Sequence, residues 1–437
     1  MLVDEFDMPA VAAPLAPTPE IAARLRGEAE RLRTPLYVYD GAALDRAADA
    51  VHRAFPDPWI RLYSLKANAT PGVVARIAAR GFGANAVSRG ELSLAARAGV
   101  SPERSALEGI GKSARDLRMA VDLAADGIPL LWVSVESADE AAALADVAGR
   151  LLPSQRKVDV LIRVNPAVEP ETHAGLAVGL SSSKFGVAPT EVPAVIRKGG
   201  GHRGPLRWRG LHIHVGSQLA SVHAWSQALT DAVATFAAHA GDRPDFDTLD
   251  VGGGFPAGLL GAPEPVDFST AADEAIRTAP RGSRPTRLAI EPGRILVAEA
   301  GWLVARVLHV RQRPYKGTQT VRQIVIDAGM TELVRPALYG AEHPIAALTS
   351  MGHPADEDPR AFEAVVDGPI CESTDRFGEA LLPPLERGDL VAVGLAGAYA
   401  SAMFSSYNGR PRPPEVMLGS DGTRTVLRPR GSLRALP

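Results

Sequence analysis

The chain has 437 residues, a single cysteine and a formal net charge of -3, from 47 basic and 50 acidic side chains. This length exceeds one ordinary hydrophobic core and predicts about two domains. The balanced charge excludes a general field for nucleic acid or an anionic membrane, so small-molecule chemistry is favoured. A single cysteine excludes an internal disulfide framework.

The amino-terminal sequence predicts a cytoplasmic protein. The start MLVDEFDMPAVAAPLAPTPE has acidic residues and prolines where a signal peptide has basic residues and an apolar run. No uninterrupted apolar segment approaches the ~20 residues that cross a bilayer, so we expect no membrane partner. The first two dozen residues are rich in Ala and Pro, which predicts a loose arm with little structure.

From Thr34 onward, apolar runs alternate with Ala-rich amphipathic patterns, and helices are expected over 71–81, 113–127 and 137–151. Eight runs read as buried strands: 61–68, 82–88, 105–111, 129–137, 158–166, 209–217, 247–254 and 287–294. Eight such strands with helix-length crossovers predict a closed α/β barrel of the (β/α)8, TIM-like class. An open doubly wound sheet is the alternative, but its first strand would normally precede a Gly-rich turn, and LKANATPG is not one.

After Arg294 the pattern changes to strands and turns, with apolar or alternating runs over 301–312, 320–329, 362–371, 389–399 and 423–431. This half predicts a mostly β domain, either a barrel or a sandwich. The change carries no flexible linker, which indicates two tightly packed domains. We expect residues 36–294 to form the barrel, and residues 295–437 with the arm 1–35 to form the second domain.

The stretch LYSLKANATPG, residues 62–72, places Lys66 in a run that otherwise reads as a buried strand. A charged lysine is almost never fully buried without a partner, because desolvation destabilises the ammonium or lowers its pKa. Lys66 is therefore a neutral nucleophile or a paired cation, unless its side chain reaches solvent at the strand end.

Reactive groups of such a barrel lie at the carboxyl ends of its strands. The polar and glycine positions expected there are Lys66, Ser88, Arg163, His214, Ser217, Gly252 to Gly254, and Glu291 to Arg294. The glycines of DVGGGFP free the backbone to bring N–H groups close to a phosphate, although a plain tight turn is the alternative. Arg294 can add a fixed charge, and Glu291 would lie deeper, where it could bond a ring nitrogen and keep it protonated.

His212 and His214 alternate by two, so both are expected on the same side of their strand. A metal site would need a third ligand, and none is evident at metal-site spacing, so we predict no metal. A lysine, a phosphate cradle and a carboxylate able to hold a pyridinium fit pyridoxal 5'-phosphate (PLP), whose aldehyde bonds a deprotonated amine. The sequence therefore predicts PLP as cofactor, with Lys66 as its covalent anchor.

Six motifs occur in a characteristic order: YSLKAN, HIHVGSQL, DVGGGFP, EPGR, GPICESTDRFG and GAYASAMFSSYNGRPRPPEV. Together they resemble the PLP-dependent decarboxylases of alanine-racemase-like fold, and most of all the diaminopimelate decarboxylase branch of that family. The resemblance runs from TPLYVYD to RPRPPEV, nearly the whole chain. It implies that an amino acid is the substrate and that two identical subunits share their active sites.

The resemblance also assigns roles by position. It implies that Lys66 anchors the cofactor, that His214 stacks on its ring and that Glu291 bonds its pyridine nitrogen. Cys371 would donate a proton after carbon dioxide leaves, reaching the site from the second subunit of a head-to-tail homodimer. The phosphate region would be held by Ser217, Gly252, Gly253, Gly254, Gly293, Arg294 and Tyr399. The substrate positions would be Arg294, Arg335, Tyr339, Glu372 and Tyr399, with Glu372 suited to a second ammonium group.

Two stretches depart from the family pattern. Where the family usually reads Gly-Ala-Asp-Val-Val-Ser-Gly-Gly-Glu-Leu, this chain has GANAVSRGEL, so Asn85 replaces an acidic residue and Arg89 replaces a glycine. The segment 329–345 lacks the usual Asn-Asp-Leu and the aromatic residue before its histidine. Both stretches are expected near the place where the substrate is chosen.

The expected reaction is conversion of meso-2,6-diaminopimelate to L-lysine and carbon dioxide. A related decarboxylase for another diamino acid in secondary metabolism is one alternative, and an inactive binding protein of the same fold is another. Lys66, Glu291 and Cys371 are all present, which favours an enzyme. A racemase would need an acid and a base on both faces of the ring, and CESTD favours decarboxylation.

Overall fold

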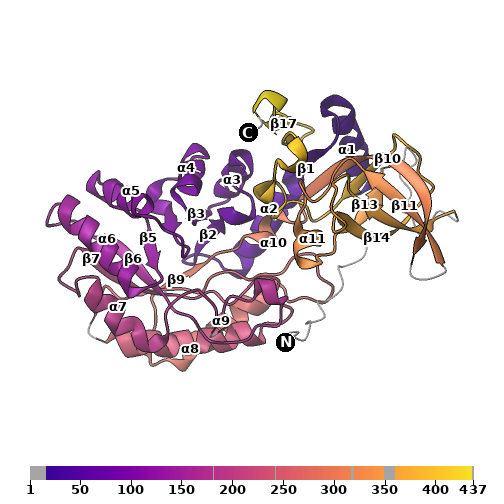
Figure 1. Ribbon diagram of the computed structural model, residues 1–437. Coiled ribbons are helices and arrows are strands. Elements are labelled where there is room, and N and C mark those ends of the chain that lie inside the picture. The colour runs from indigo at the N-terminus through magenta and orange to yellow at the C-terminus, as the bar shows by residue number, and fades with distance from the viewer. Residues whose placement is uncertain (1–15, 181, 242, 316–318, 349–359, 436–437) are drawn as a thin grey trace. The chain divides into compact units, whose positions relative to one another are not determined.

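The structure is a computed structural model that describes residues 16–180, 182–241, 243–315, 319–348 and 360–435. It divides into two compact units (Figure 1). The first unit consists of Asp45–Pro256 and Ala262–Gly293, and the second of residues 16–44, 257–261 and 294–435. None of the described helices is both long enough and apolar enough to span a bilayer.

Eight parallel strands close into a barrel in the first unit, each paired with the next and the last with the first. They are β2 (Ile60–Ser64), β3 (Gly83–Ala86), β4 (Ser105–Leu107), β5 (Trp132–Val135), β6 (Val158–Arg163), β7 (Leu206–His212), β8 (Thr248–Asp250) and β9 (Arg287–Ile290). Each of the eight predicted runs overlaps one of these strands. The predicted closed barrel is confirmed.

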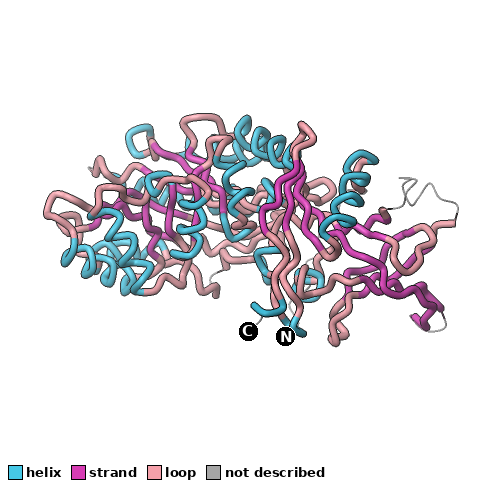
Figure 2. The backbone as a smooth tube through the Cα atoms, turned by 90° about the horizontal axis from the view of Figure 1, so that it is seen from above, coloured by secondary structure: helices cyan, strands magenta, loops and turns pink. Residues whose placement is uncertain are grey.

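Helices connect and surround these strands (Figure 2). They are α2 (Gly41–Ala54), α3 (Pro71–Ala78), α4 (Arg89–Arg97), α5 (Ala114–Ala125), α6 (Ala138–Leu151), α7 (Val192–Lys198), α8 (His223–Ala240) and α9 (Pro265–Thr278). Local sequence explains where several begin, because Ser88, Ser113 and Ser137 accept backbone N–H groups of α4, α5 and α6. The three predicted helices are confirmed as α3, α5 and α6.

The inside of the barrel is filled by side chains, with a cluster of Leu62, Ala106, Trp132, Leu161 and Ala289. The wall is closely packed where β7 meets β8. Gly210 is paired with Thr248 there and has φ +150°, and a Cβ added to it would lie 1.8 Å from the Thr248 carbonyl oxygen. Only a glycine allows the two strands to approach this closely.

The second unit is built on a sheet of order β14-β13-β11-β10-β1-β16-β17, with β15 paired to β10 and β12. Its strands are β1 (Leu36–Asp40), β10 (Gly301–Tyr315), β11 (Gln319–Ile326), β12 (Ile345–Ala347), β13 (Phe362–Asp367), β14 (Arg376–Leu382), β15 (Leu390–Val393), β16 (Glu415–Leu418) and β17 (Arg424–Arg428). Two short helices, α10 (Arg294–Val297) and α11 (Arg335–Tyr339), accompany them. The prediction of a mostly β second domain is confirmed.

The amino-terminal region differs from the expectation. Residues 1–15 lie outside the described part of the chain, but Pro19–Leu32 forms helix α1. The Thr18 hydroxyl caps it by accepting from the Ile21 N–H at 3.3 Å, and Ala22, Leu25 and Ala29 pack into the core of the second unit. The expectation of little structure is therefore wrong for residues 19–24, because these apolar positions recur at helical spacing.

Strand β1 belongs to the sheet of the second unit. The sequence placed residue 36 at the start of the barrel domain, whereas β1 pairs antiparallel with β10 and parallel with β16. The first strand of the barrel is β2. A local apolar pattern predicts that residues 36–40 form a strand, but it contains no information about which sheet the strand joins.

Arg335 and His343 form a buried pair in the second unit. Arg335 Nη1 lies 3.3 Å from His343 Nε2, and His343 Nδ1 lies 2.8 Å from the carbonyl oxygen of Gly394. Because a carbonyl only accepts, Nδ1 carries the hydrogen and Nε2 accepts from the guanidinium. Burial, and then the charge of Arg335, lower the pKa of His343 to about 3. His343 is therefore neutral at ordinary pH.

We predict that Gly210→Ala lowers the free energy of unfolding by roughly 3 kcal/mol, because its Cβ would be forced into a packed strand pair. Thermal unfolding would report the change as a lower Tm. Gly149→Ala is the matched control, since Gly149 lies in α6 with no atom within 4 Å of an added Cβ. The control should stabilise the protein by up to about 1 kcal/mol. Equal shifts in both variants would contradict this account.

We predict that stability falls as the pH drops from about 6.5 toward 3, in part because of His343. The unfolded chain binds a proton on this side chain below its ordinary pKa of 6.5, whereas the native state resists protonation down to about pH 3. The contribution reaches up to about 1.4 kcal/mol per pH unit. His343→Gln should flatten the pH dependence, measured by urea unfolding at several pH values in this window. Parallel curves for the two proteins would refute the assignment.

Candidate active site

The predicted site residues of the first unit lie at the carboxyl ends of the barrel strands. Lys66 lies in a single turn, Leu65–Ala67, directly after β2, and His214 follows β7 by two residues. Gly252 to Gly254 follow β8, and Glu291 follows β9. In a closed parallel barrel these ends share one face. The structure thus places this group on one face, as predicted.

Lys66 is half-buried, which corrects the expectation of a buried strand lysine. Its neighbours Leu65 and Ala67 are fully buried, so the turn is fixed while the amine remains accessible at the barrel mouth. Within the described part of the chain, no carboxylate forms an ion pair with Lys66. An accessible amine without an ion-pair partner is suited to act as a nucleophile.

The three glycines let the loop after β8 lie directly against its neighbours. A Cβ at Gly252 would lie 2.4 Å from the carbonyl oxygen of Ile213, and one at Gly253 would lie 2.5 Å from that of Glu291. The Gly252 N–H donates to Asp250 Oδ1 and the Gly253 N–H to His214 Nδ1. The Gly254 N–H has no acceptor among the described residues. Of the three N–H groups, that of Gly254 is the one available to an anion.

His214 presents a neutral imidazole with a fixed orientation. Its Nδ1 accepts from the Gly253 N–H at 3.1 Å, so the ring hydrogen is on Nε2. Burial, and then the charge of Lys66, hold the pKa of His214 well below its ordinary value. A neutral ring held in this way is suited to pack against another flat ring.

Glu291 is an acidic side chain that is 3 % exposed and has an unused acceptor. Its Oε1 makes no hydrogen bond to any described residue. Burial, followed by the charges of Glu108 and Asp250, raises its pKa well above the usual range. A buried carboxyl group with a free oxygen fits a ring nitrogen that needs a proton. With the Lys66 amine and the Gly254 N–H, the residues present fit PLP.

Sequence reasoning missed Glu108, although it follows strand β4 just as Glu291 follows β9. His212 lies between the two, with its Nε2 3.6 Å from Glu108 and 3.5 Å from Glu291. Ligand atoms of these three residues lie within 4.8 Å of one another. The sequence suggested that no third metal-capable group accompanies the histidines, and the structure contradicts this. The three residues are far apart in the sequence, and only closure of the barrel brings them together.

A second group of predicted residues lies in the second unit. The guanidinium of the buried Arg294 lies 4.6 Å from the ring centre of Tyr399. Arg335 is also buried, and burial followed by the charge of Arg294 lowers its pKa to about 9, while the nearby Tyr339 and Tyr399 oppose this shift. The structure therefore brings these four residues together. Two buried guanidinium groups are suited to a carboxylate ligand.

Cys371 and Glu372 are exposed and contact a different part of the second unit. The Asn408 amide donates to Cys371 Sγ at 3.2 Å, and the Tyr407 hydroxyl donates to Glu372 Oε1 at 2.8 Å. The adjacent residues Tyr407 and Asn408 thus hydrogen-bond to the adjacent candidate site residues Glu372 and Cys371. Tyr407 and Asn408 belong to the quoted motif SSYNGRP, but sequence reasoning assigned them no role.

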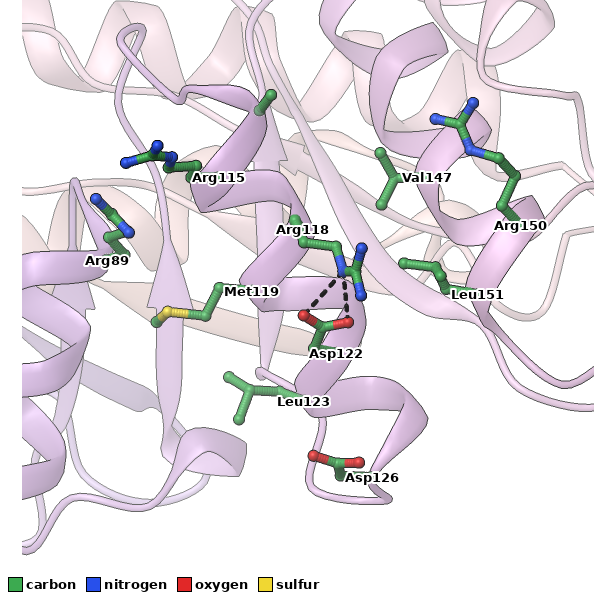
Figure 3. Close-up of a pocket in the computed structure, with 11 residues that line it drawn as sticks. Arg89, Arg115, Arg118, Met119, Asp122, Leu123, Asp126, Val147, Arg150 and Leu151 are labelled. Carbon is green, nitrogen blue, oxygen red and sulfur yellow. Dashed lines mark hydrogen bonds and ion pairs between the residues drawn. The ribbon is translucent and has the colours of Figure 1, made fainter.

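The two residues that depart from the family pattern at 85 and 89 lie in different surroundings. Asn85 lies in β3 and is 2 % exposed. Arg89 begins α4 and is exposed, and it lines a groove with residues of α5 and α6 (Figure 3). None of the predicted site residues lines this groove. Only the change at position 85 therefore concerns the barrel interior.

The second stretch that departs from the family pattern, segment 329–345, places residues at buried positions. Thr331 and Glu332 are each 1 % exposed, and Glu332 Oε2 accepts from the Gly329 N–H and the Thr331 hydroxyl. The segment then continues into α11, which carries Arg335 and Tyr339. Its unusual residues therefore support the turn that leads into two of the predicted substrate positions.

Comparison with known proteins agrees with this geometry. A family profile described as "Pyridoxal-dependent decarboxylase, pyridoxal binding domain" matches residues 42–298. Diaminopimelate decarboxylase of Deinococcus radiodurans is 38% identical over 400 residues, covering 90% of this chain and 92% of the relative. The Aquifex aeolicus enzyme of the same name is 34% identical over 408 residues, covering 92% and 90%.

A solved structure also resembles this chain over nearly its whole length. The diaminopimelate decarboxylase of Helicobacter pylori, complexed with L-lysine, superposes with a TM-score of 0.83 at 30% identity. The match covers 94% of this chain and 97% of that one. The fold, the residues at the barrel mouth and these relatives agree, and the chain belongs to the family of pyridoxal-dependent decarboxylases that includes the diaminopimelate decarboxylases.

Proposed function

We propose that this protein is a carboxy-lyase that converts meso-2,6-diaminopimelate to L-lysine and carbon dioxide with PLP as cofactor. The observation that carries the proposal is the unused, buried oxygen of Glu291, which lies on the barrel face that also carries the Lys66 amine. The names of the relatives support the substrate, as does the L-lysine in the Helicobacter pylori structure.

When bound, PLP supplies an electron sink for the charge left on carbon as carbon dioxide departs. Lys66 offers an accessible amine as anchor, and the neutral His214 ring offers a flat surface. Glu291 holds a proton at the position proposed for the ring nitrogen. Ser217, Gly254 and Gly293 would bind the phosphate through backbone and hydroxyl groups.

The second unit offers groups that match the two ends of the proposed substrate. Arg294 and Arg335 are suited to carboxylates, with Tyr339 and Tyr399 beside them. Glu372 is suited to the distal ammonium group, and the Cys371 thiol to delivering a proton to the carbon that lost its carboxylate.

The exposure of Cys371 and Glu372 supports a homodimer in which they complete the neighbouring subunit's site. In such an arrangement an exposed residue of one protomer becomes buried against its partner. The cytoplasmic location expected from the sequence stays a prediction.

The substrate is tested by supplying meso-diaminopimelate, lysine, ornithine or arginine to the PLP-loaded enzyme and measuring carbon dioxide release. We expect release from meso-diaminopimelate, with L-lysine as product identified by chromatography. Release from another of these amino acids alone would favour the related decarboxylase, and racemised substrate without carbon dioxide would favour a racemase. No reaction of a PLP-loaded protein would favour the inactive binding protein.

Lys66→Ala should reduce turnover to background, because the variant has no amine at the barrel mouth to bond the cofactor aldehyde. Borohydride treatment followed by peptide mapping should locate reduced cofactor on Lys66 in the wild type and nowhere in the variant. Lys198→Ala is the matched control, because Lys198 is an exposed lysine of helix α7 in the same unit. Full activity of Lys66→Ala would overturn the assignment.

Tyr407→Phe should raise the KM for meso-diaminopimelate by about threefold to tenfold with a smaller change in kcat, because Glu372 loses the hydroxyl that orients it. Glu372→Ala should raise the KM further. The double variant should then equal Glu372→Ala alone, because Tyr407 acts through Glu372. Additive effects of the two substitutions would show that Tyr407 acts by another route.

A further inference from the structure

Glu108 is a buried acidic residue of the barrel that has no part in the proposed function. It follows β4, is 3 % exposed, and contacts three other buried side chains. Asn85 Nδ2 donates to its Oε2 at 3.3 Å, and Trp132 Nε1 lies 3.5 Å from its Oε1. The third contact is His212, at 3.6 Å. Glu108 is thus held from three directions.

Glu108 lies next to Asn85, the residue that replaces an acidic residue of the family pattern. The family pattern has an acidic residue at position 85, and this chain has an amide there. Asn85 lies in β3, which is hydrogen-bonded to β4, the strand that leads to Glu108. The Asn85 amide donates to Glu108, so the barrel interior has a carboxylate directly after the adjacent strand. An amide is the appropriate partner, because a second carboxylate at position 85 would repel the first.

Glu108 interacts directly with Glu291, and both lie beside His212. The single nitrogen His212 Nε2 faces both carboxyl groups, at 3.6 and 3.5 Å, and has no hydrogen-bond partner in the described chain. His212 Nδ1 in turn lies 2.9 Å from the Ser134 hydroxyl, which fixes the plane of the ring. The imidazole therefore lies beside both carboxyl groups, which also interact directly with each other. The Glu291 oxygen nearest to His212 Nε2 is Oε1, which has no hydrogen-bond partner in the described chain.

We propose that Glu108 is a positioning residue for the cofactor: held by Asn85, it replaces the acid missing at position 85 and keeps Glu291 oriented toward the ring nitrogen of PLP. This inference rests on the proposed role of Glu291. It adds a residue of this chain that acts on the cofactor only through Glu291.

The electrostatics support this arrangement. Two buried carboxyl groups this close do not both carry a charge, so the pair retains a proton. Burial, and then the charge of Glu108, raises the pKa of both Glu291 and Asp250. With PLP bound, Glu291 would hold this proton beside the ring nitrogen. The other charged or titratable groups that influence this cluster are Lys66, Lys112, Arg163, His212 and His214.

Three variants test the inference: Glu108→Gln, Asn85→Asp, and the double variant N85D/E108Q, which returns the carboxylate to position 85. We expect Glu108→Gln to weaken PLP binding to the apoenzyme about tenfold, measured by equilibrium dialysis. The pH at which the absorbance of bound PLP changes should also move downward, because removal of a negative charge favours loss of the proton. The double variant should recover both properties to within about threefold of the wild type.

The double variant is the matched control, since it has the same number of carboxylates and amides as the wild type. Wild-type PLP affinity and absorbance in Glu108→Gln would overturn the inference, as would a double variant that binds PLP no better than Glu108→Gln. Asn85→Asp alone adds a charge and should lower the Tm of the apoenzyme; an unchanged Tm would argue against contact with Glu108.

Glu108→Asp keeps the proposal testable if Glu108→Gln does not fold. This variant retains a carboxylate, but its side chain is shorter by one methylene group, so the carboxylate lies farther from its partners. Wild-type PLP affinity and absorbance in Glu108→Asp would show that the position of the carboxylate does not matter, and would overturn the inference. The outcome is independent of the substrate assignment. A wild type that binds PLP but releases no carbon dioxide from meso-diaminopimelate would refute the proposed function alone.

Discussion

Closure of eight parallel strands into one barrel is the constraint on which the first unit depends. A parallel barrel has no free edge, so the strands must be short, apolar and tightly paired, and their carboxyl ends must meet on one face. Gly210 and the glycines after β8 allow the required close approach of backbone to backbone. Residues separated by more than two hundred positions, such as Lys66 and Glu291, are thereby brought to a common face.

Burial is the largest cause of the pKa shifts at the candidate site residues of both units, but it acts on different kinds of group in each. In the barrel, burial favours protonated carboxyl groups at Asp250 and Glu291 and neutral rings at His212 and His214. In the second unit, burial acts on guanidinium groups at Arg294 and Arg335. The first environment is suited to holding a proton near a ring nitrogen, and the second to binding carboxylates. Decarboxylation of an amino acid with PLP uses both kinds of environment.

The exposed pair Cys371 and Glu372 differs from both buried groups. Their geometry is maintained by hydrogen bonds from Asn408 and Tyr407 rather than by packing. Asn408 has φ +56°, a conformation that asparagine tolerates better than most side chains. A turn at the surface can therefore hold a thiol and a carboxylate in place without burying either.

Much of the fold could be predicted from sequence, because the apolar period of a strand or helix depends on neighbouring residues. Local patterns predict the eight barrel strands and helices α3, α5 and α6. They also predict the change near residue 294 from alternating strands and helices to mostly strands, and the position of Lys66 at the end of its strand. The placement of β1 and the packing of α1 do not, because sheet pairing depends on partners far along the chain. Glu108 shows the same limit most clearly. A carboxylate after a short strand looks ordinary in sequence, and its distances to Asn85, His212 and Glu291 exist only once the barrel has closed.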